Sequence, residues 1–139
     1  MLRWFTPEEV DKLIPRLERI VSELIRQAVQ VRTVVLSLAQ ALGCEPQDLG
    51  HEELVAHSPE LGETLETMRR LLQEIHRCGG IFKGMELGLV DFPARIDGEE
   101  VYLCWQYGEP EVAFYHRPED GFAGRKPLNR RISRTPPLQ

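Results

Sequence analysis

Residues 5–42 read FTPEEVDKLIPRLERIVSELIRQAVQVRTVVLSLAQAL, and this stretch decides the fold. It begins with the signals of a helix N-terminus: Thr6 can cap the helix, Pro7 suits the first helical position, and Glu9 can close a capping box. Apolar residues then recur at alternating steps of four and three, which is the heptad period of a coiled coil. The series is Val10, Ile14, Leu17, Val21, Leu24, Ala28, Val31, Val35, Leu38 and Leu42. The stretch therefore predicts one long helix over residues 7–42, about 54 Å in length.

A second helix is predicted over residues 59–78. Ser58 can cap it, Pro59 opens it, and apolar residues again follow at steps of four and three. These residues are Leu61, Leu65, Met68, Leu72 and Ile75. Gly43 suits the C-terminal cap of the first helix, and residues 44–57 should form a loop with a short helical turn. The two helices are expected to form an antiparallel, coiled-coil-like hairpin.

The first helix outruns the second, which at about 30 Å covers little more than half of it. The apolar seam from Val10 to Val21 therefore has no partner within the hairpin. A symmetric homodimer through the first helix is the expected way to cover it. The alternative is that the sheet of the same chain covers the seam and the protein stays a monomer. The covering face would then comprise Phe92, Leu103, Trp105 and Phe114.

After Gly80 the apolar pattern changes to a period of two, interrupted by the turns DGEE and YGEP. This pattern predicts a small three-stranded antiparallel meander within residues 89–117, with one apolar face. Residues 118–128 should fold back as a closing loop. The expected class is α+β, with one domain over residues 1–128 and a flexible basic tail over 129–139.

The charge is distributed unevenly along the chain. Residues 1–120 hold all 22 acidic residues and 12 of the 17 basic ones, so this part is strongly acidic. The remaining bases are Arg125, Lys126, Arg130, Arg131 and Arg134. Such a tail could contact nucleic acid weakly and without sequence specificity, but the acidic body opposes a phosphate backbone. We therefore expect the tail to lie along the acidic body or a partner subunit.

Composition also indicates the compartment. The N-terminus has no apolar signal-peptide core, and no run of about 18 apolar residues occurs, so neither secretion nor membrane insertion is expected. The three cysteines, Cys44, Cys78 and Cys104, are widely spaced and form no C-x-x-C pair. Free thiols in a reducing cytoplasm are the expected state.

The stretch GLVDFPARIDGEEVYLCWQYGEPEVAFYHRPEDGFAGRKPL resembles the signature of the bacterial proteins grouped as domain of unknown function 2203. The resemblance runs from the capped helix through Leu128. The matching positions are Asp91, Phe92, Pro93, Cys104, Trp105, Gly108, Glu109, His116 and Gly121 through Arg125. The resemblance implies a bacterial, cytoplasmic protein and carries no assigned activity.

One candidate functional cluster comprises Asp91, Cys104, Glu109, His116 and Arg125. A metal-dependent hydrolase would use Asp91, Glu109 and His116 as ligands of a divalent cation. The simplest strand register opposes this arrangement. It places His116 on the apolar face, as a satisfied core residue, about 17 Å from the acidic end of the sheet. Arg125 is expected to pair with those acids and not to cradle an anion.

Cysteine-based sites are not favoured. His76 and Cys78 could join Cys104 and His116 in a zinc site, but only one loosely spaced pair exists. Buried, unreactive thiols are the preferred interpretation, because Cys104 has no base beside it in the sequence. The leading hypothesis for function is a non-enzymatic interaction or scaffold module acting through its helical hairpin. The metal-dependent enzyme and weak nucleic-acid binding through the tail are the two alternatives.

Overall fold

The first helix has the predicted extent and both predicted caps. The computed structural model describes residues 3–129, and its first element, α1, spans Pro7–Leu42. The Thr6 hydroxyl accepts the Glu9 N–H at 3.1 Å, and the Glu9 carboxylate accepts the Thr6 N–H at 2.9 Å. Gly43 ends the helix in the left-handed conformation that a C-terminal cap requires. The capping box and the glycine cap are therefore confirmed.

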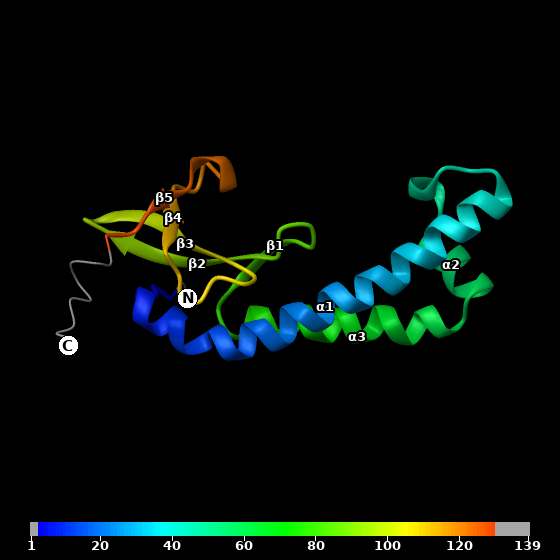
Figure 1. Ribbon diagram of the computed structural model, residues 1–139, viewed down its shortest axis with the longest axis horizontal. Helices are drawn as coiled ribbons and strands as arrows, with labels where there is room; N and C mark the ends of the chain where they lie inside the picture. Colours follow the sequence, from blue (N-terminus) through cyan, green and yellow to red (C-terminus); the bar gives the residue numbers. More distant parts are fainter. Residues whose placement is uncertain (1–2, 130–139) are drawn as a thin grey trace.

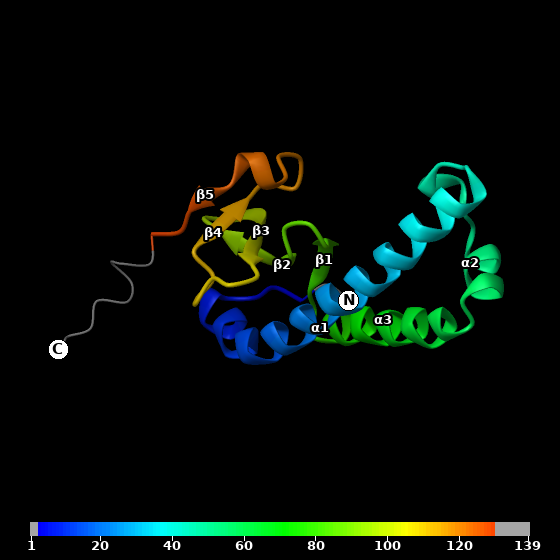
Figure 2. The same ribbon diagram turned by 45° about the vertical axis from the view of Figure 1, so that its right-hand side comes forward.

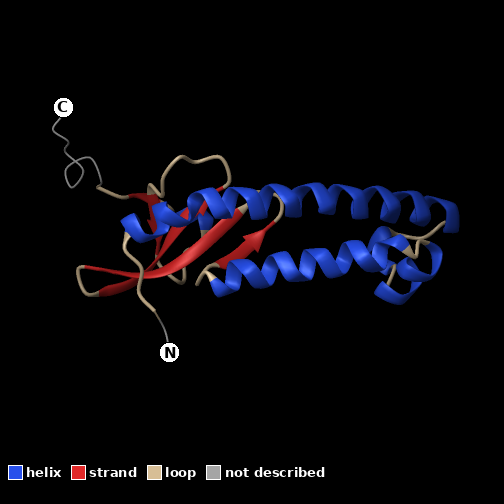
Figure 3. Ribbon diagram, turned by 90° about the horizontal axis from the view of Figure 1, so that it is seen from below, coloured by secondary structure: helices blue, strands red, loops and turns tan. Residues whose placement is uncertain are grey.

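The hairpin partner of α1 is α3 (Glu60–Arg77), close to the predicted 59–78. The linker contains a 3-10 turn, η1 (Pro46–Asp48), and a short helix, α2 (His51–His57), in keeping with the predicted helical turn. Figure 3 shows α1 and α3 antiparallel and side by side. In Figure 2 the C-terminal half of α1 diverges from α3, and α2 joins the two ends.

The predicted seam of α1 is fully buried only in its first half. Its residues from Val10 to Leu24 are buried, whereas Ala28, Val31 and Val35 are half-buried and Leu42 is exposed. The loss of burial coincides with the divergence of the helices. The apolar residues of the heptad pattern are therefore closely packed only where α1 has both α3 and the sheet as neighbours.

The sheet has five antiparallel strands in the order β1-β2-β3-β4-β5, so the predicted three-stranded meander is wrong. The strands are β1 (Ile81–Gly84), β2 (Leu89–Ile96), β3 (Glu99–Gln106), β4 (Phe114–His116) and β5 (Lys126–Pro127). The two strands that were missed are the edge strands. β1 has four residues and β5 two, which is too short for an alternating pattern to stand out.

The hydrophobic core lies between α1 and one face of this sheet. Val10, Leu17 and Leu24 of α1 share one buried cluster with Phe92 and Trp105 of the sheet. The sheet of the same chain thus covers the seam that the sequence left without a partner. The reason for expecting a homodimer through that seam, its lack of a cover, therefore no longer holds. The homodimer itself stays a prediction.

The N-terminal segment and the connection after α3 close the same core. Phe5 donates its N–H to the carbonyl of Pro93 at 2.7 Å, and its ring packs edge-on against Phe92. Gly79 follows α3 with a φ of 95°, and a Cβ there would lie 2.3 Å from the Phe5 ring. Only glycine therefore fits this turn between helix and sheet.

A third layer covers the other face of the sheet. The loop after β4, with its 3-10 turn η2 (Phe122–Gly124), lies on the side of the sheet away from α1 (Figures 1 and 2). We call this side the outer face and the side against α1 the inner face. Among residues 3–129, no helix has the length and apolar character that crossing a membrane requires.

Candidate metal site

Asp91, Cys104 and His116 come together on the outer face from three neighbouring strands. Asp91 of β2 is the cross-strand partner of Cys104 in β3, and His116 of β4 is the partner of Tyr102. Cross-strand partners point to the same side of a sheet, as do residues two apart on one strand. The alternation that sends Phe92 and Leu103 into the core therefore sends this group to the outer face.

The three side chains form a tight, buried cluster. A carboxylate oxygen of Asp91, Sγ of Cys104 and a ring nitrogen of His116 all lie within 4.8 Å of one another. The exposed fractions are 1% for Asp91, 1% for Cys104 and 4% for His116. No other group of three such residues within residues 3–129 has this geometry.

Hydrogen bonds fix the ring of His116. Its Nδ1 lies 2.8 Å from the backbone carbonyl of Arg117, and its Nε2 lies 2.9 Å from Oδ2 of Asp91. A carbonyl oxygen can only accept, so Nδ1 carries a hydrogen and donates it. Nε2 is thereby directed at the cluster, which is the orientation of a metal-binding histidine whose other nitrogen is held by a backbone carbonyl.

The second oxygen of Asp91 has no partner. Oδ1 is buried and accepts no hydrogen bond from any group in the described part of the chain. A buried carboxylate oxygen left in this state carries a desolvation penalty of about 1–3 kcal/mol or more. A cation between Asp91, Cys104 and His116 would remove that penalty.

Cys104 is a protonated thiol in the metal-free protein. Burial, and next the negative charge of Asp91, raise the pKa of the Cys104 thiol to about 12. The sequence had predicted an unreactive, buried thiol, and this shift agrees with it. A bound transition metal reverses the situation, because a coordinating thiol is deprotonated.

The donor set suits zinc. Zinc takes thiolate, imidazole and carboxylate ligands at about 2.0–2.3 Å, whereas magnesium and calcium prefer oxygen alone. Ligand atoms around a tetrahedral zinc ion lie about 3.3–3.7 Å apart, given those bond lengths. A cluster within 4.8 Å needs only small side-chain movements to reach that spacing.

Glu109 and Arg125 lie next to the cluster and not in it. Arg125 pairs with the Glu109 carboxylate at 3.0 Å and donates to the Cys104 carbonyl at 3.1 Å. Its guanidinium also lies over the rings of Phe114 and Phe122. The predicted pairing of Arg125 with an acid of the sheet is confirmed. Glu109, a candidate metal ligand in the enzyme alternative, instead accepts hydrogen bonds from Arg125 and from the backbone N–H of Gln106.

Two predictions for His116 are wrong: its separation from Asp91, and its place on the apolar face of the sheet. Val112 lies before β4, so its phase does not carry into the strand, and His116 faces outward with Tyr102. Phe114, which was assigned to the apolar face, faces outward as well, and Tyr115 packs against the core in its place.

The other predicted site residues remain apart from the cluster. Cys78 lies 3.6 Å from an Arg16 nitrogen, and His76 is exposed at the end of α3. Neither joins the group formed by Asp91, Cys104 and His116. Lys126 lies in β5, and the rest of the predicted basic tail, Arg130, Arg131 and Arg134, lies outside the described residues.

A pocket borders the cluster. Its volume is about 350 Å³, and Asp91, Cys104 and His116 form part of its wall. Lys83 and Phe122 line it as well, and neither was singled out from the sequence. Nothing in the sequence around Lys83 marks it, because its place depends on β1, the strand that was missed.

The family model of the uncharacterized conserved proteins DUF2203 matches residues 3–128. The match spans nearly the whole chain, so the chain belongs to this family, as the resemblance predicted. No curated protein and no solved structure matches the chain significantly.

Proposed function

We propose that this member of the DUF2203 family is a zinc-dependent enzyme that holds one zinc ion through Asp91, Cys104 and His116. One observation carries the proposal: three different zinc-binding side chains converge within 4.8 Å on the wall of one pocket. Three protein ligands leave the fourth position of a tetrahedral ion for water or substrate. That coordination is typical of catalytic zinc sites and not of structural ones, which are closed by four ligands.

Hydrolysis of an ester or amide is the reaction class that this arrangement favours. A zinc ion with an open position supplies an activated water and polarises a carbonyl oxygen. The protein would supply orientation: the Arg117 carbonyl holds the His116 ring, and Arg125 holds the backbone of Cys104. Burial of the ligands strengthens electrostatic interactions at the pocket wall.

The proposal is tested by zinc affinity in a matched set of variants of the full chain. Competition with a chelator gives the dissociation constant of wild type, Asp91→Asn, Cys104→Ser and His116→Asn. Each of the three variants should bind zinc at least about a hundredfold more weakly than wild type. Loss of a residue that only hydrogen-bonds to a metal ligand already lowers affinity about 10–100-fold, and these residues are the ligands themselves.

Two variants serve as matched controls, Cys78→Ser and His76→Asn, because both side chains lie outside the cluster. They should bind zinc within about twofold of wild type. Circular dichroism establishes that all five variants are folded. Site variants that bind zinc as tightly as these controls would refute the metal centre.

A contact surface on the helical hairpin is a second candidate function, supported by apolar exposure. The exposed fractions are 58% for Val29 and 47% for Leu36, both on the diverging half of α1. Such residues suit a protein partner, of which a second copy of the chain is the simplest. Sedimentation at micromolar concentration should show a dimer that Leu36→Asp dissociates, and a 16 kDa species alone would exclude self-association.

A further inference from the structure

The pocket beside the cluster has apolar walls. Leu89 and Pro118 contribute to them, and Leu87 and Phe122 are large apolar side chains with exposed fractions of 43% and 41%. Large apolar side chains left open around a concave site favour a ligand with an apolar body. The pocket volume of about 350 Å³ falls at the lower end of the range for small-molecule sites.

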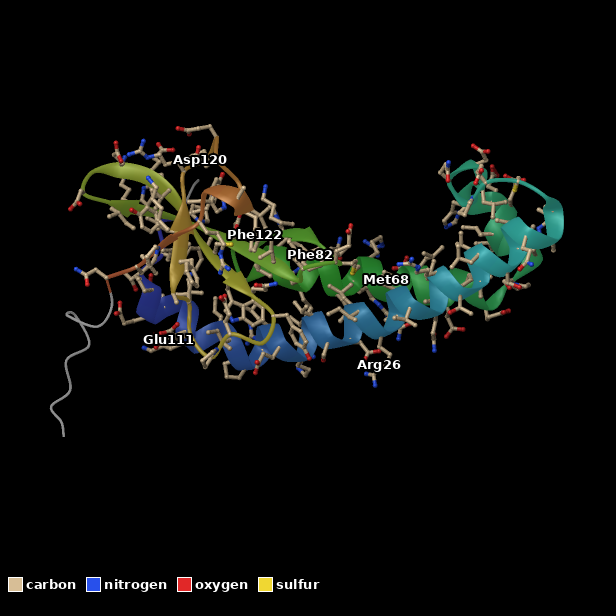
Figure 4. The ribbon with its side chains drawn as sticks, turned by 45° about the horizontal axis from the view of Figure 1, so that its top comes forward. Arg26, Met68, Phe82, Glu111, Asp120 and Phe122 are labelled. Atoms are coloured by element: carbon tan, nitrogen blue, oxygen red, sulfur yellow. The ribbon has the colours of Figure 1, made fainter. Side chains whose placement is uncertain are left out.

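The wall that carries Phe122 is held in place. Phe122 projects from the loop after β4 (Figure 4), and the Arg125 guanidinium lies 5.0 Å from its ring centroid. Arg125 is itself held by Glu109 and by the carbonyl of Cys104. The apolar wall and the proposed zinc ligand are thus braced by one side chain, which preorganises the pocket.

Lys83 is the one cation among the ten residues that line the pocket. It lies at the irregularity between Phe82 and Gly84 in the pairing of β1 with β2, so strand alternation does not place it; its place in the wall of the same pocket as Asp91 puts it on the outer face. Its ammonium group pairs with no carboxylate of residues 3–129. A lysine in this state can bind an anionic group of a ligand.

The net charge of the zinc-loaded site indicates which anionic group a ligand would carry. A zinc ion is neutralised by the Asp91 carboxylate and the Cys104 thiolate, and Arg125 is neutralised by Glu109. Lys83 then leaves a single positive charge in the pocket. A carboxylate, with one negative charge, balances it, whereas a phosphate monoester carries about −1.5 to −2 at neutral pH and would need a second cation.

We infer that the site binds a small carboxylate with an aromatic or branched aliphatic body, its charged group between the zinc position and Lys83 and its body between Leu87 and Phe122. This inference rests on the proposed zinc centre. A carboxylate is also the acid product of ester or amide hydrolysis, so the ligand class agrees with the proposed reaction.

Cobalt substitution provides the test. Cobalt(II) replaces zinc in such sites, and its visible absorption reports any ligand that enters the open position. Phenylacetate should bind saturably to the cobalt-loaded full chain and change that absorption. Acetate, which lacks the body, and phenyl phosphate, which carries the second charge, should each bind at least about tenfold more weakly.

Variants of Lys83 and Phe122 separate the two parts of the pocket. Lys83→Met keeps the aliphatic stem and should weaken phenylacetate about tenfold, whereas Lys83→Arg should stay within about threefold. Phe122→Ala should weaken phenylacetate and leave acetate unchanged.

The outcomes distinguish this inference from the proposed function. A protein that takes up no cobalt or zinc defeats the metal centre before any carboxylate is added. Stoichiometric cobalt with an absorption spectrum that phenylacetate leaves unchanged overturns the carboxylate inference alone. Tighter binding of phenyl phosphate, or equal phenylacetate affinity in Lys83→Met, overturns it as well.

Discussion

At the scale of single residues, the Cys104 thiol and the hydrogen-bonded pair of Asp91 and His116 form one cluster in the metal-free protein. Nε2 of His116 and Oδ2 of Asp91 lie 2.9 Å apart, which is hydrogen-bonding distance. The Cys104 thiol holds a proton at neutral pH, because its pKa is raised to about 12. Zinc would replace this proton, since a thiol ligand binds in its deprotonated form.

Zinc binding should therefore release the Cys104 proton at neutral pH, so at least about one proton per chain. Isothermal titration calorimetry in buffers of different ionisation enthalpy counts them. Cys104→Ser at saturating zinc should release about one proton fewer than wild type, because the thiol is gone. Release of none, or the same number in both proteins, would mean that Cys104 is not a ligand.

The site residues could be named from the sequence, but their convergence in one cluster could not be predicted from it. Cys104 and Tyr102 alternate with core residues, so their face was readable from the period of two. The distance from Asp91 to His116 was not readable, because it depends on where β4 begins. The Val112 N–H donates to Asp11 of α1 at 2.9 Å, across 101 positions of sequence, and such a contact has no local signature.

At the scale of elements, α1 has two halves with different neighbours. Leu17 is fully buried between α3 and the sheet, whereas Leu36 lies on the diverging half and is largely exposed. The heptad pattern runs through both without a break. Helical periodicity therefore predicted the helix and its bounds, but not which part of its apolar side would be covered.

Leu17→Ala should cost about 2–5 kcal/mol of unfolding free energy, the usual range for a core leucine. Leu36→Ala should change it by less than about 0.5 kcal/mol, as for an exposed position. Urea unfolding followed by circular dichroism gives both values. Equal losses in the two variants would mean that the distal half of α1 is packed as tightly as the proximal half.

The strands also differ in whether local sequence or tertiary pairing determines them. β2 and β3 have eight residues each and were predicted from alternation and the turn between them. β1 exists because it pairs with β2, and β5 because it pairs with β4, and a segment of four or two residues carries too little pattern to predict such a tertiary contact. The pocket is lined by Lys83 of β1 and by Phe122 of the loop after β4, so it could not be predicted from the sequence.

At the scale of the whole molecule, the buried thiol links stability to pH. The ordinary thiol pKa of 9.0 applies when the chain is unfolded, and the folded value is about 12. Below pH 9 both states hold the proton and stability is full. Between pH 9 and 12 only the unfolded state loses it, so stability falls with rising pH.

The metal-free protein should lose about 1.4 kcal/mol of unfolding free energy per pH unit above pH 9 from this group alone. Cys104→Ser has no such group, so its decline should be shallower by that amount. Urea unfolding of both proteins, with chelator present, between pH 8 and about 10.5 measures the difference. Parallel curves would show that burial of Cys104 does not shift its ionisation.

The central claim is that Asp91, Cys104 and His116 together hold one zinc ion, and X-ray absorption at the zinc edge tests it most directly. The full chain, purified without a histidine tag and loaded with one equivalent of zinc, should show one sulfur neighbour at about 2.3 Å. The other neighbours should be nitrogen or oxygen at about 2.0–2.2 Å. Cys104→Ser should lose the sulfur, and Cys78→Ser should keep it. A coordination shell without sulfur, one with two or more sulfurs, or a sulfur that survives Cys104→Ser would contradict the account.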